Sequence, residues 1–208
     1  PAQANALSKA LIGELQGAFD SIAADPAVRI VVIAGAGKAF SAGHDLKEMR
    51  ATPYKRYYVE LFNQCSQMMM AITRLPQPVI ARVHGIATAA GCQLVAACDL
   101  AVAAEEARFA TSGINVGLFC STPGVAVSRN VGRKQAFEML VTGEFIGARE
   151  ALVRGLVNRV VPAAELDAEV AKLAAAILSK SPAAVASGKQ MFYRQLEMGA
   201  EGAYRFAC

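Results

Sequence analysis

The sequence contains no tryptophan, and its five cysteines form an odd set without a Cys-x-x-Cys pair. It also lacks, at its start, a charged leader followed by an apolar stretch. These absences indicate a reduced compartment, the cytoplasm or, in a eukaryote, the mitochondrial matrix, with thiols that are mostly buried. We predict no metal site.

Clustered positive charge is missing as well. The formal net charge is +4, the lysines and arginines are scattered, and no aromatic stripe runs between them. This pattern argues against a nucleic-acid partner, while a mildly basic surface suits a small anionic ligand.

The sequence has no long uninterrupted apolar segment. Residues 109–128 carry no formal charge, but glycines, polar residues and Pro123 interrupt them, so we expect no membrane span. What is present is 54% hydrophobic residues in a chain of 208 residues. That is enough for the core of one globular domain.

The first part of the chain alternates between helical and strand-like patterns. Apolar residues recur at helical spacing from Leu7 to Ile22, and Asp25-Pro26 ends that helix. Buried strands are predicted at 29–34, 79–83 and 100–103, with a helix at 54–74. This alternation predicts parallel strands joined by crossover connections.

After Thr122 the pattern becomes mostly helical, and only residues 157–161 are strand-like. The predicted helices cover residues 125–131, 134–141, 148–152, 166–178 and 183–196. We therefore divide the chain into a core at 1–145 and a helical C-terminal region at 146–208.

Two loops of small residues, Gly35–Leu46 and His84–Gln93, each follow a buried strand. The first loop fits neither a dinucleotide fingerprint, because Phe40 takes the place of the third glycine, nor a P-loop, because Ala39 follows Lys38. It remains either a tight connection or part of a binding site.

The second loop places small residues, Ala89 to Gly91, at the start of a helix. Backbone N–H groups there have no helical partner and lie at the positive end of the helix dipole. They would stabilise a carbonyl oxygen that acquires negative charge, and one donor from each loop would make an oxyanion hole. The same small residues would also let the helix pack closely against the sheet.

The two loops belong to a series of motifs along the chain. These motifs are Asn5-Ala-Leu7, the run from Gly37 to Met49, Pro78 to Ala81 with His84-Gly85, Ala90 to Leu94 with Cys98-Asp99, Phe109 to Gly117, Thr142-Gly143, Ala151-Leu152, Gly155 to Asn158 and Val160-Val161. Over nearly the whole chain the sequence thus resembles the crotonase, or enoyl-CoA hydratase/isomerase, superfamily. It looks most like the branch of the enoyl-CoA hydratase domain-containing proteins 3.

The resemblance implies an α/β fold, a crotonase-like spiral of β-β-α turns with a helical C-terminal region that builds homotrimers or hexamers. It implies an acyl-CoA ligand and no resident cofactor, because coenzyme A is part of the substrate. The implied reactions belong to the lyase or isomerase class of fatty acid metabolism.

The resemblance also assigns site residues. The backbone N–H groups of His44 and Ala90 match the two oxyanion donors. The expected contacts of the coenzyme and the acyl group are Ala42, Asp45, Leu46, Lys47, Gly113, Cys120 and Ser121.

Both catalytic glutamates of the family's hydratases are replaced in this sequence. One position, three residues after the second oxyanion donor, holds Gln93, and the other, four residues after Phe109, holds Gly113. An amide can orient water but cannot take up or release a proton near neutral pH, so Gln93 is at most a positioning residue.

Other side chains could substitute for the missing acids. Cys120 is either a reactive thiol or a packed one, and packing is favoured because no histidine is near it in sequence. Ser121 and Thr122, before Pro123, are expected to cap a helix. Glu60, on a helix that covers the pocket in this family, is the remaining carboxylate of interest.

We expect structural roles for the other polar residues of these motifs. The His44 ring should line the pocket, and His84 should make a local hydrogen bond. Asp45 and Asp99 should cap turns. The methionines at 68–70 should fill the core.

The sequence therefore predicts an acyl-CoA-binding enzyme of this family that polarises the thioester carbonyl. Hydration by two glutamates is disfavoured by Gln93 and Gly113. The alternatives are decarboxylase-like enolate chemistry on an acyl-CoA, and a non-catalytic acyl-CoA-binding or regulatory protein.

Overall fold

The first six strands of the chain alternate between two four-stranded sheets in the computed structural model, which describes residues 3–208. The first sheet has the order β1 (Val31–Ala34), β3 (Val79–Val83), β5 (Leu100–Ala104) and β8 (Arg159–Val161). The second has the order β2 (Ala39–Ser41), β4 (Ile86–Thr88), β6 (Arg108–Ala110) and β7 (Ile146–Gly147).

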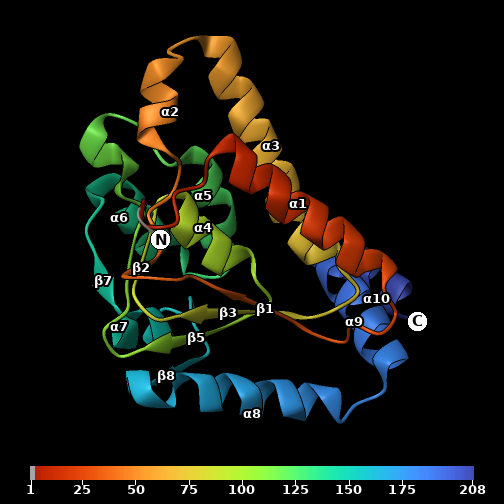
Figure 1. Cartoon of the computed structure of the whole chain (residues 1–208). Coiled ribbons are helices and arrows are strands. Elements are labelled where there is room, and N and C mark those ends of the chain that lie inside the picture. Colours follow the sequence, from red (N-terminus) through yellow and green to blue (C-terminus); the bar gives the residue numbers. More distant parts are fainter. Residues whose placement is uncertain (1–2) are drawn as a thin grey trace.

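All neighbours in the first sheet are parallel, as the alternating pattern predicts. In the second sheet β2, β4 and β6 are parallel, and only β7 pairs antiparallel with β6. Each strand of the first sheet up to β5 is followed at once by a strand of the second, so that β-β-α turns of a spiral result (Figure 1).

Helices cover both faces of the first sheet. Those of the first half are α1 (Lys9–Ala24), α2 (Leu46–Ala51), α3 (Lys55–Arg74) and α4 (Ala90–Ala97), followed by the 3-10 helix η1 (Ser112–Val116). Those of the second half are α5 (Ser121–Val127), α6 (Arg133–Thr142), α7 (Ala148–Val153), η2 (Ala163–Glu165), α8 (Leu166–Leu178), α9 (Pro182–Leu196) and α10 (Ala200–Ala207).

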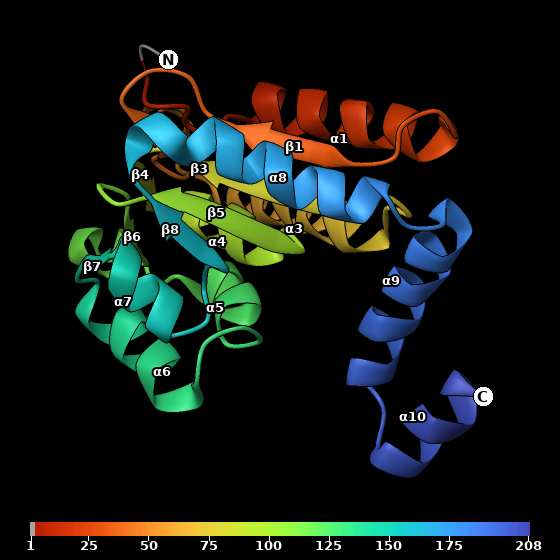
Figure 2. The same cartoon turned by 90° about the horizontal axis from the view of Figure 1, so that it is seen from below.

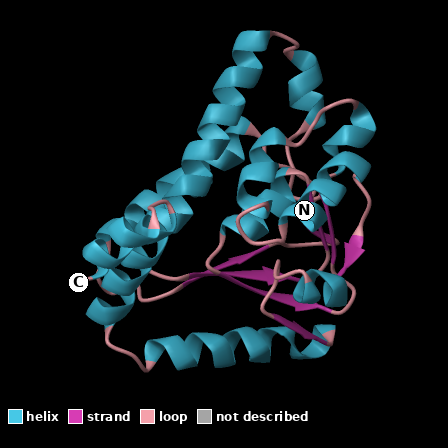
Figure 3. Ribbon diagram, turned by 180° about the vertical axis from the view of Figure 1, so that it is seen from behind, coloured by secondary structure: helices cyan, strands magenta, loops and turns pink. Residues whose placement is uncertain are grey.

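The alternation of side chains along the strands separates two hydrophobic clusters. In β3, Val79, Ala81 and Val83 face the larger cluster with α1, α3 and α4, whereas Ile80 faces the smaller one. The smaller cluster joins the sheet to α8 through residues such as Leu166. The first sheet thus lies between α8 on one side and the other helices on the other (Figures 1 and 3).

Several predicted elements agree closely with the structure. The strand at 79–83 and the helix at 166–178 have the predicted limits, the helices at 54–74, 148–152 and 183–196 differ by one residue at one end, and the helix at 134–141 is longer by one residue at each end. Strands β2, β4, β6 and β7 were not predicted, because runs of two or three residues show no readable alternation.

The helix predicted at 125–131 is wrong in its limits, since α5 spans Ser121–Val127. Ser121 and Thr122 therefore lie inside the first turn and do not cap it; Cys120 is the capping residue and offers no side-chain hydrogen bond. The prediction assumed that Pro123 stands at the first helical position. A proline anywhere in the first turn is tolerated, because the N–H groups there lack helical acceptors.

A buried ion pair fastens α9 to the sheet. The Lys189 ammonium donates to Asp99 Oδ2 at 2.6 Å and to the carbonyls of Ile72 and Gln77, each at 2.9 Å. The Tyr193 hydroxyl donates to Asp99 Oδ1 at 2.7 Å, and the same carboxylate accepts from the amide of Val79. Asp99 was expected to cap a turn, and its carboxylate in fact joins β3 to α9.

Beyond this anchor, α9 and α10 project away from the two sheets (Figure 2). Strands β7 and β8 complete sheets that begin before residue 145, so the two predicted regions share their sheets; the boundary itself stays a prediction. Among the helices of residues 3–208, none combines the length and the apolar character that crossing a bilayer requires.

Candidate active site

A cavity of about 230 Å³ lies where the two loops of small residues meet. Its wall combines these loops with η1 and the start of α5. The lining residues are Ala42, His44, Leu46, Met49, Phe62, Ala89, Ala90, Ser112, Gly113, Val116, Leu118, Phe119, Cys120, Ser121, Thr122 and Pro123.

The segment before α1 holds the first loop in place. The Asn5 side-chain amide donates to the carbonyls of Ala36 and Ala39 at 2.8 Å and of Phe40 at 3.1 Å. The amide of Leu7 donates to the carbonyl of Gly43 at 2.7 Å. Asn5 and Leu7, noticed in the sequence only as part of a family motif, thus position the loop that carries His44.

The two loops touch at Gly43. Its φ of +87° is a left-handed conformation, and a Cβ there would lie 2.9 Å from the Cβ of Ala89 and 3.1 Å from the amide nitrogen of Ala90. Ala89 also has a positive φ, 50°, which costs energy for a residue with a side chain. The start of α4 thus lies directly against the turn at Gly43.

The amides of His44 and Ala90 both belong to residues that line the cavity. Within residues 3–208, neither amide donates a hydrogen bond to a backbone or side-chain acceptor. Ala90 is the first residue of α4, so its N–H lies at the positive end of the helix dipole. Two amides without an acceptor among the described residues, one from each loop, thus belong to residues that line one cavity.

The structure brings most of the predicted contact residues to one cavity. Those that line it are Ala42, His44, Leu46, Ala90, Gly113, Cys120 and Ser121. Asp45 and Lys47 lie outside the lining: Asp45 caps α2 by accepting from the amides of Lys47 and Glu48, at 2.8 and 3.2 Å. Their predicted roles toward the coenzyme remain predictions.

Gln93 is buried one turn beyond the Ala90 amide. Its side chain is 4% exposed, and Oε1 has no hydrogen-bond donor among the described residues. It is not one of the residues that line the cavity. A buried acceptor without a hydrogen-bond donor lowers the stability of the fold. Packing alone therefore does not explain a polar side chain at position 93.

Gly113 occupies a position with no room for a side chain. A Cβ there would lie 2.5 Å from the carbonyl oxygen of Leu118 and 2.8 Å from Sγ of Cys120. The amide of Gly113 donates to the same sulfur at 3.3 Å. Burial raises the pKa of the Cys120 thiol, against the effect of this hydrogen bond. Cys120 is thus a buried thiol that also faces the cavity.

The imidazole of His44 is held by its surroundings. Nδ1 lies 3.3 Å from the carbonyl oxygen of Leu7, so Nδ1 carries the proton of the neutral ring. Nε2 is buried and has no partner among the described residues. Burial lowers the pKa of His44, which keeps the ring uncharged. The ring lines the cavity, but its free nitrogen is not open to it.

Glu60 is directed away from the cavity. It accepts from Arg56 at 2.9 Å and from Lys9 at 3.4 Å, and its side chain is 47% exposed. The helix face that does line the cavity carries Phe62, whose ring centroid lies 5.4 Å from that of His44. Glu60 therefore cannot supply the missing carboxylate in this arrangement.

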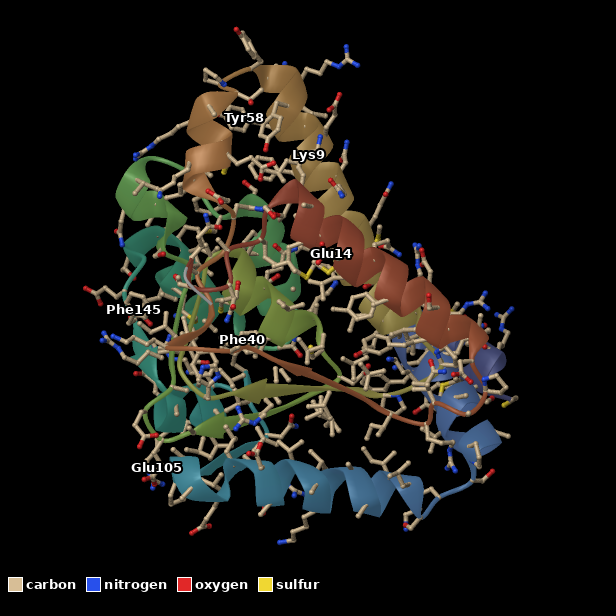
Figure 4. The ribbon with its side chains drawn as sticks, viewed as in Figure 1. Lys9, Glu14, Phe40, Tyr58, Glu105 and Phe145 are labelled. Atoms are coloured by element: carbon tan, nitrogen blue, oxygen red, sulfur yellow. The ribbon has the colours of Figure 1, made fainter. Side chains whose placement is uncertain are left out.

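Helices α2 and α3 form the outer wall of the cavity. Tyr58 lies between them near the top of the molecule, where its hydroxyl donates to the carbonyl of Met49 at 3.1 Å (Figure 4). Its ring stacks on Phe62 with a centroid distance of 6.4 Å. Met49 and Phe62 belong to this wall. Met49 ends one of the family motifs in the sequence, whereas Phe62 shows only ordinary helical periodicity.

The other predicted polar residues have structural roles. The ring of His84 lies 2.9 Å from the carbonyl oxygen of Gly37, so its hydrogen bond is structural as expected but not local, because it reaches the first loop. Met68 and Met69 are buried in the core as predicted, whereas Met70 is 42% exposed. Within the described residues, no group of three or more His, Cys, Asp and Glu side chains could hold a metal ion.

The chain matches the family model of enoyl-CoA hydratase/isomerase over residues 1–206. It is 52% identical over 205 residues to the mitochondrial enoyl-CoA hydratase domain-containing protein 3 of Xenopus laevis, covering 99% of this chain and 70% of that protein.

Two solved structures are also closely similar. A crystal structure of enoyl-CoA hydratase from Mycobacterium smegmatis has a TM-score of 0.99 and 64% identity, covering 100% of this chain and 80% of its own. The human enoyl-CoA hydratase domain-containing protein 3 has a TM-score of 0.96 and 49% identity, covering 100% of this chain and 82% of its own. Fold, sequence and order of motifs agree: the chain belongs to the enoyl-CoA hydratase/isomerase family, in the branch of the enoyl-CoA hydratase domain-containing proteins 3.

Proposed function

We propose that this protein binds an acyl-CoA and polarises its thioester carbonyl between the backbone amides of His44 and Ala90. The observation that carries the proposal is the pair of unpaired N–H groups at one cavity. A thioester oxygen that accepts from both would gain negative charge, and an enolate formed beside it would be stabilised. Loss of one such donor typically costs about 10²–10³ in rate.

Hydration requires one group to activate water and one to protonate the α-carbon. Among the described residues that line the cavity there is no aspartate or glutamate. The titratable groups there are His44, whose Nε2 is covered, and Cys120, whose pKa is raised by burial. General acid–base help is worth about 10²–10⁴ per group, so hydration by this site should be very slow.

The same lack of carboxylates favours decarboxylation of a malonyl-type thioester as the reaction. In that step the bond between the α-carbon and the carboxylate breaks, carbon dioxide leaves, and its bonding electrons form the thioester enolate. Water then protonates the α-carbon. Only the enolate oxygen needs stabilisation in the bond-breaking step, which the two amides supply. A protein that binds acyl-CoA without chemistry has the same site and is the remaining alternative.

The coenzyme would extend from the cavity along the first loop. Ala42 and Leu46 line the cavity at that end. Lys47 is exposed beside them, at the start of α2, where its ammonium would reach a phosphate of the coenzyme. Asp45 would act indirectly, by holding the amide of Lys47. No resident cofactor is needed for this chemistry.

We further propose a homotrimer or hexamer located in the cytoplasm or in the mitochondrial matrix. Apolar side chains on the projecting helices support the association, because Phe192 on α9 is 51% exposed and Tyr204 on α10 is 77% exposed. The mass of the assembly measured by light scattering tests this proposal, and a monomer at micromolar concentration would contradict it.

Carbonyl polarisation is directly measurable by infrared spectroscopy of butyryl-CoA labelled with 13C at the thioester carbonyl. We expect the C=O stretch to move to lower frequency on binding, and butyryl-CoA to bind more tightly than S-butyl-CoA, which lacks the carbonyl. An unchanged stretch together with equal affinities would overturn the proposed role of the two amides.

A variant with Ala90→Pro removes one donor at a helix position where proline is tolerated. It should bind butyryl-CoA no better than S-butyl-CoA. Ala200→Pro, at the same position of the exposed helix α10, is the matched control and should leave the preference intact. Release of carbon dioxide from malonyl-CoA and methylmalonyl-CoA then distinguishes the decarboxylase from the binding protein.

A further inference from the structure

A second cavity, of about 510 Å³, lies apart from the acyl site, where the end of α1 meets the end of α8 and the start of α9. It shares no lining residue with the first cavity. Its volume is in the range of small-molecule sites, and its wall is mostly apolar, with Val28, Ile177 and Val185 among its residues. Three polar side chains also line it: Asp25, Arg29 and Gln77.

One side of this cavity offers acceptors. Gln77 is 6% exposed, and its Nε2 donates to the carbonyl of Ile22 at 3.0 Å, which fixes the orientation of the amide. Its Oε1 is buried and has no donor within residues 3–208. Asp25, the residue after α1, uses Oδ1 to accept from the amide of Ala27 at 2.9 Å and retains a second oxygen. An ammonium group in the cavity would donate to this free oxygen of Asp25, whereas Oε1 of Gln77 is covered.

The other side offers donors. Arg29 Nη2 donates to the carbonyl of Lys180 at 2.8 Å, just before α9 begins, and to the carbonyl of Leu178 at 3.5 Å, while its Nε and Nη1 have no acceptor among the described residues. Ser181 caps α9 by accepting from Ala184, and the amide of Ala183 has no acceptor in the described part of the chain. The positive end of the α9 dipole adds to the charge of Arg29.

Asp25 and Arg29 line the same cavity with opposite charge, yet within residues 3–208 they form no ion pair with each other or with any other residue. Each hydrogen bond that orients them runs to a different wall, Arg29 to residues before α9 and Asp25 to the turn after α1. The cavity is therefore lined by a cation and an anion that are not paired with each other, together with apolar surface.

We propose that this cavity binds a small zwitterion, an amino carboxylate with an apolar side chain. Its carboxylate accepts from Arg29 and the amide of Ala183, and its ammonium donates to Asp25. The apolar side chain lies against Val28, Ile177 and Val185. This inference is independent of the acyl-CoA site.

The test is calorimetric titration of the protein with the standard amino acids, and with two analogues of leucine that each lack one charge. 4-Methylpentanoate lacks the ammonium group, and 3-methylbutylamine lacks the carboxylate. We expect at least one apolar amino acid, with leucine as the reference probe, to bind, and each analogue to bind at least about tenfold more weakly.

Two substitutions locate the site. Asp25→Asn keeps an acceptor for Ala27 but removes the charge, and Arg29→Gln removes the cation; each should weaken amino-acid binding at least about tenfold. Asp20→Asn and Arg149→Gln change the same charges on exposed positions of α1 and α7 and should have no effect. Absence of binding by every amino acid, equal binding of the analogues, or equal effects of the control variants would overturn the proposal.

Discussion

The backbone amide of Gly113 donates a hydrogen bond to Sγ of Cys120, and a side chain at position 113 would have to enter the space of that sulfur. The two departures of this chain from the hydratase pattern therefore differ in kind. Gln93 replaces a carboxylate by an amide of the same length. At Gly113, by contrast, neighbouring atoms occupy the space that a side chain would need.

Restoring glutamate at position 113 should therefore fail to restore hydration. We expect Gly113→Glu to lower the free energy of unfolding by about 1–3 kcal/mol or more, because the carbonyl of Leu118 and the sulfur of Cys120 must move. Denaturant titration measures this loss. Gly202→Glu, at a helical glycine where a Cβ meets no atom within 4 Å, is the control and should cost little. Equal stability of the two variants would contradict the account.

Removal of the buried ammonium at position 189 should be strongly destabilising. Lys189→Met leaves the Asp99 carboxylate without its cation in a site where the lysine side chain is 6% exposed. We expect a loss of about 3–5 kcal/mol in the free energy of unfolding. Lys172→Met, on the exposed face of α8, should change it by less than about 1 kcal/mol. A mild effect at position 189 would mean that α9 is held by apolar contacts alone.

His44 should make stability depend on pH. Its pKa in the folded protein is lowered from 6.5, chiefly by burial, so below about pH 6.5 the unfolded chain binds a proton that the folded chain resists. The free energy of unfolding should therefore fall as the pH decreases below that value. The variant His44→Gln cannot titrate and should lack this contribution. The difference between the two proteins, measured by denaturation from pH 8 to pH 5, would be constant if the account is wrong.

The thiols should differ sharply in reactivity. Cys65, Cys92, Cys98 and Cys120 are buried, and burial raises the pKa of both Cys65 and Cys92 to about 12. Cys208 is exposed. Titration with Ellman's reagent at pH 8 should modify one thiol in the native protein and five after denaturation. The variant Cys208→Ser should remove the fast reaction, and a fast reaction that persists would show that a buried thiol is accessible.

The sequence was most informative where patterns are long. The buried strand at 79–83 and the amphipathic helix at 166–178 have the predicted limits, because continuous apolar runs and helical spacing are statistically strong signals. The second sheet could not be predicted from local pattern, since β2, β4 and β6 have three residues each. Those strands are stabilised by neighbours that are distant in sequence.

For the candidate site, the sequence identified the two loops but not their contacts. Small residues at 89–91 predicted unpaired amides, and the structure adds the backbone conformation of this helix start, the positive φ of Ala89, and the close approach of Gly43. The orientation of Glu60 depends on which face of α3 meets the body of the protein. The spacing of apolar residues along the helix does not determine that face. In the structure, Lys9 and Arg56 pair with the Glu60 carboxylate.

The central claim is that the site polarises an acyl thioester but lacks the groups for hydration. Its most direct test is the incubation of the protein with crotonyl-CoA at a concentration where calorimetry shows the site to be saturated, while the absorbance of the conjugated thioester is followed. We predict saturable binding without loss of that absorbance beyond the uncatalysed rate. Hydration at the rate of an ordinary enzyme, about 1–10³ per second, would contradict the claim and would require a proton-transfer group outside the cavity described.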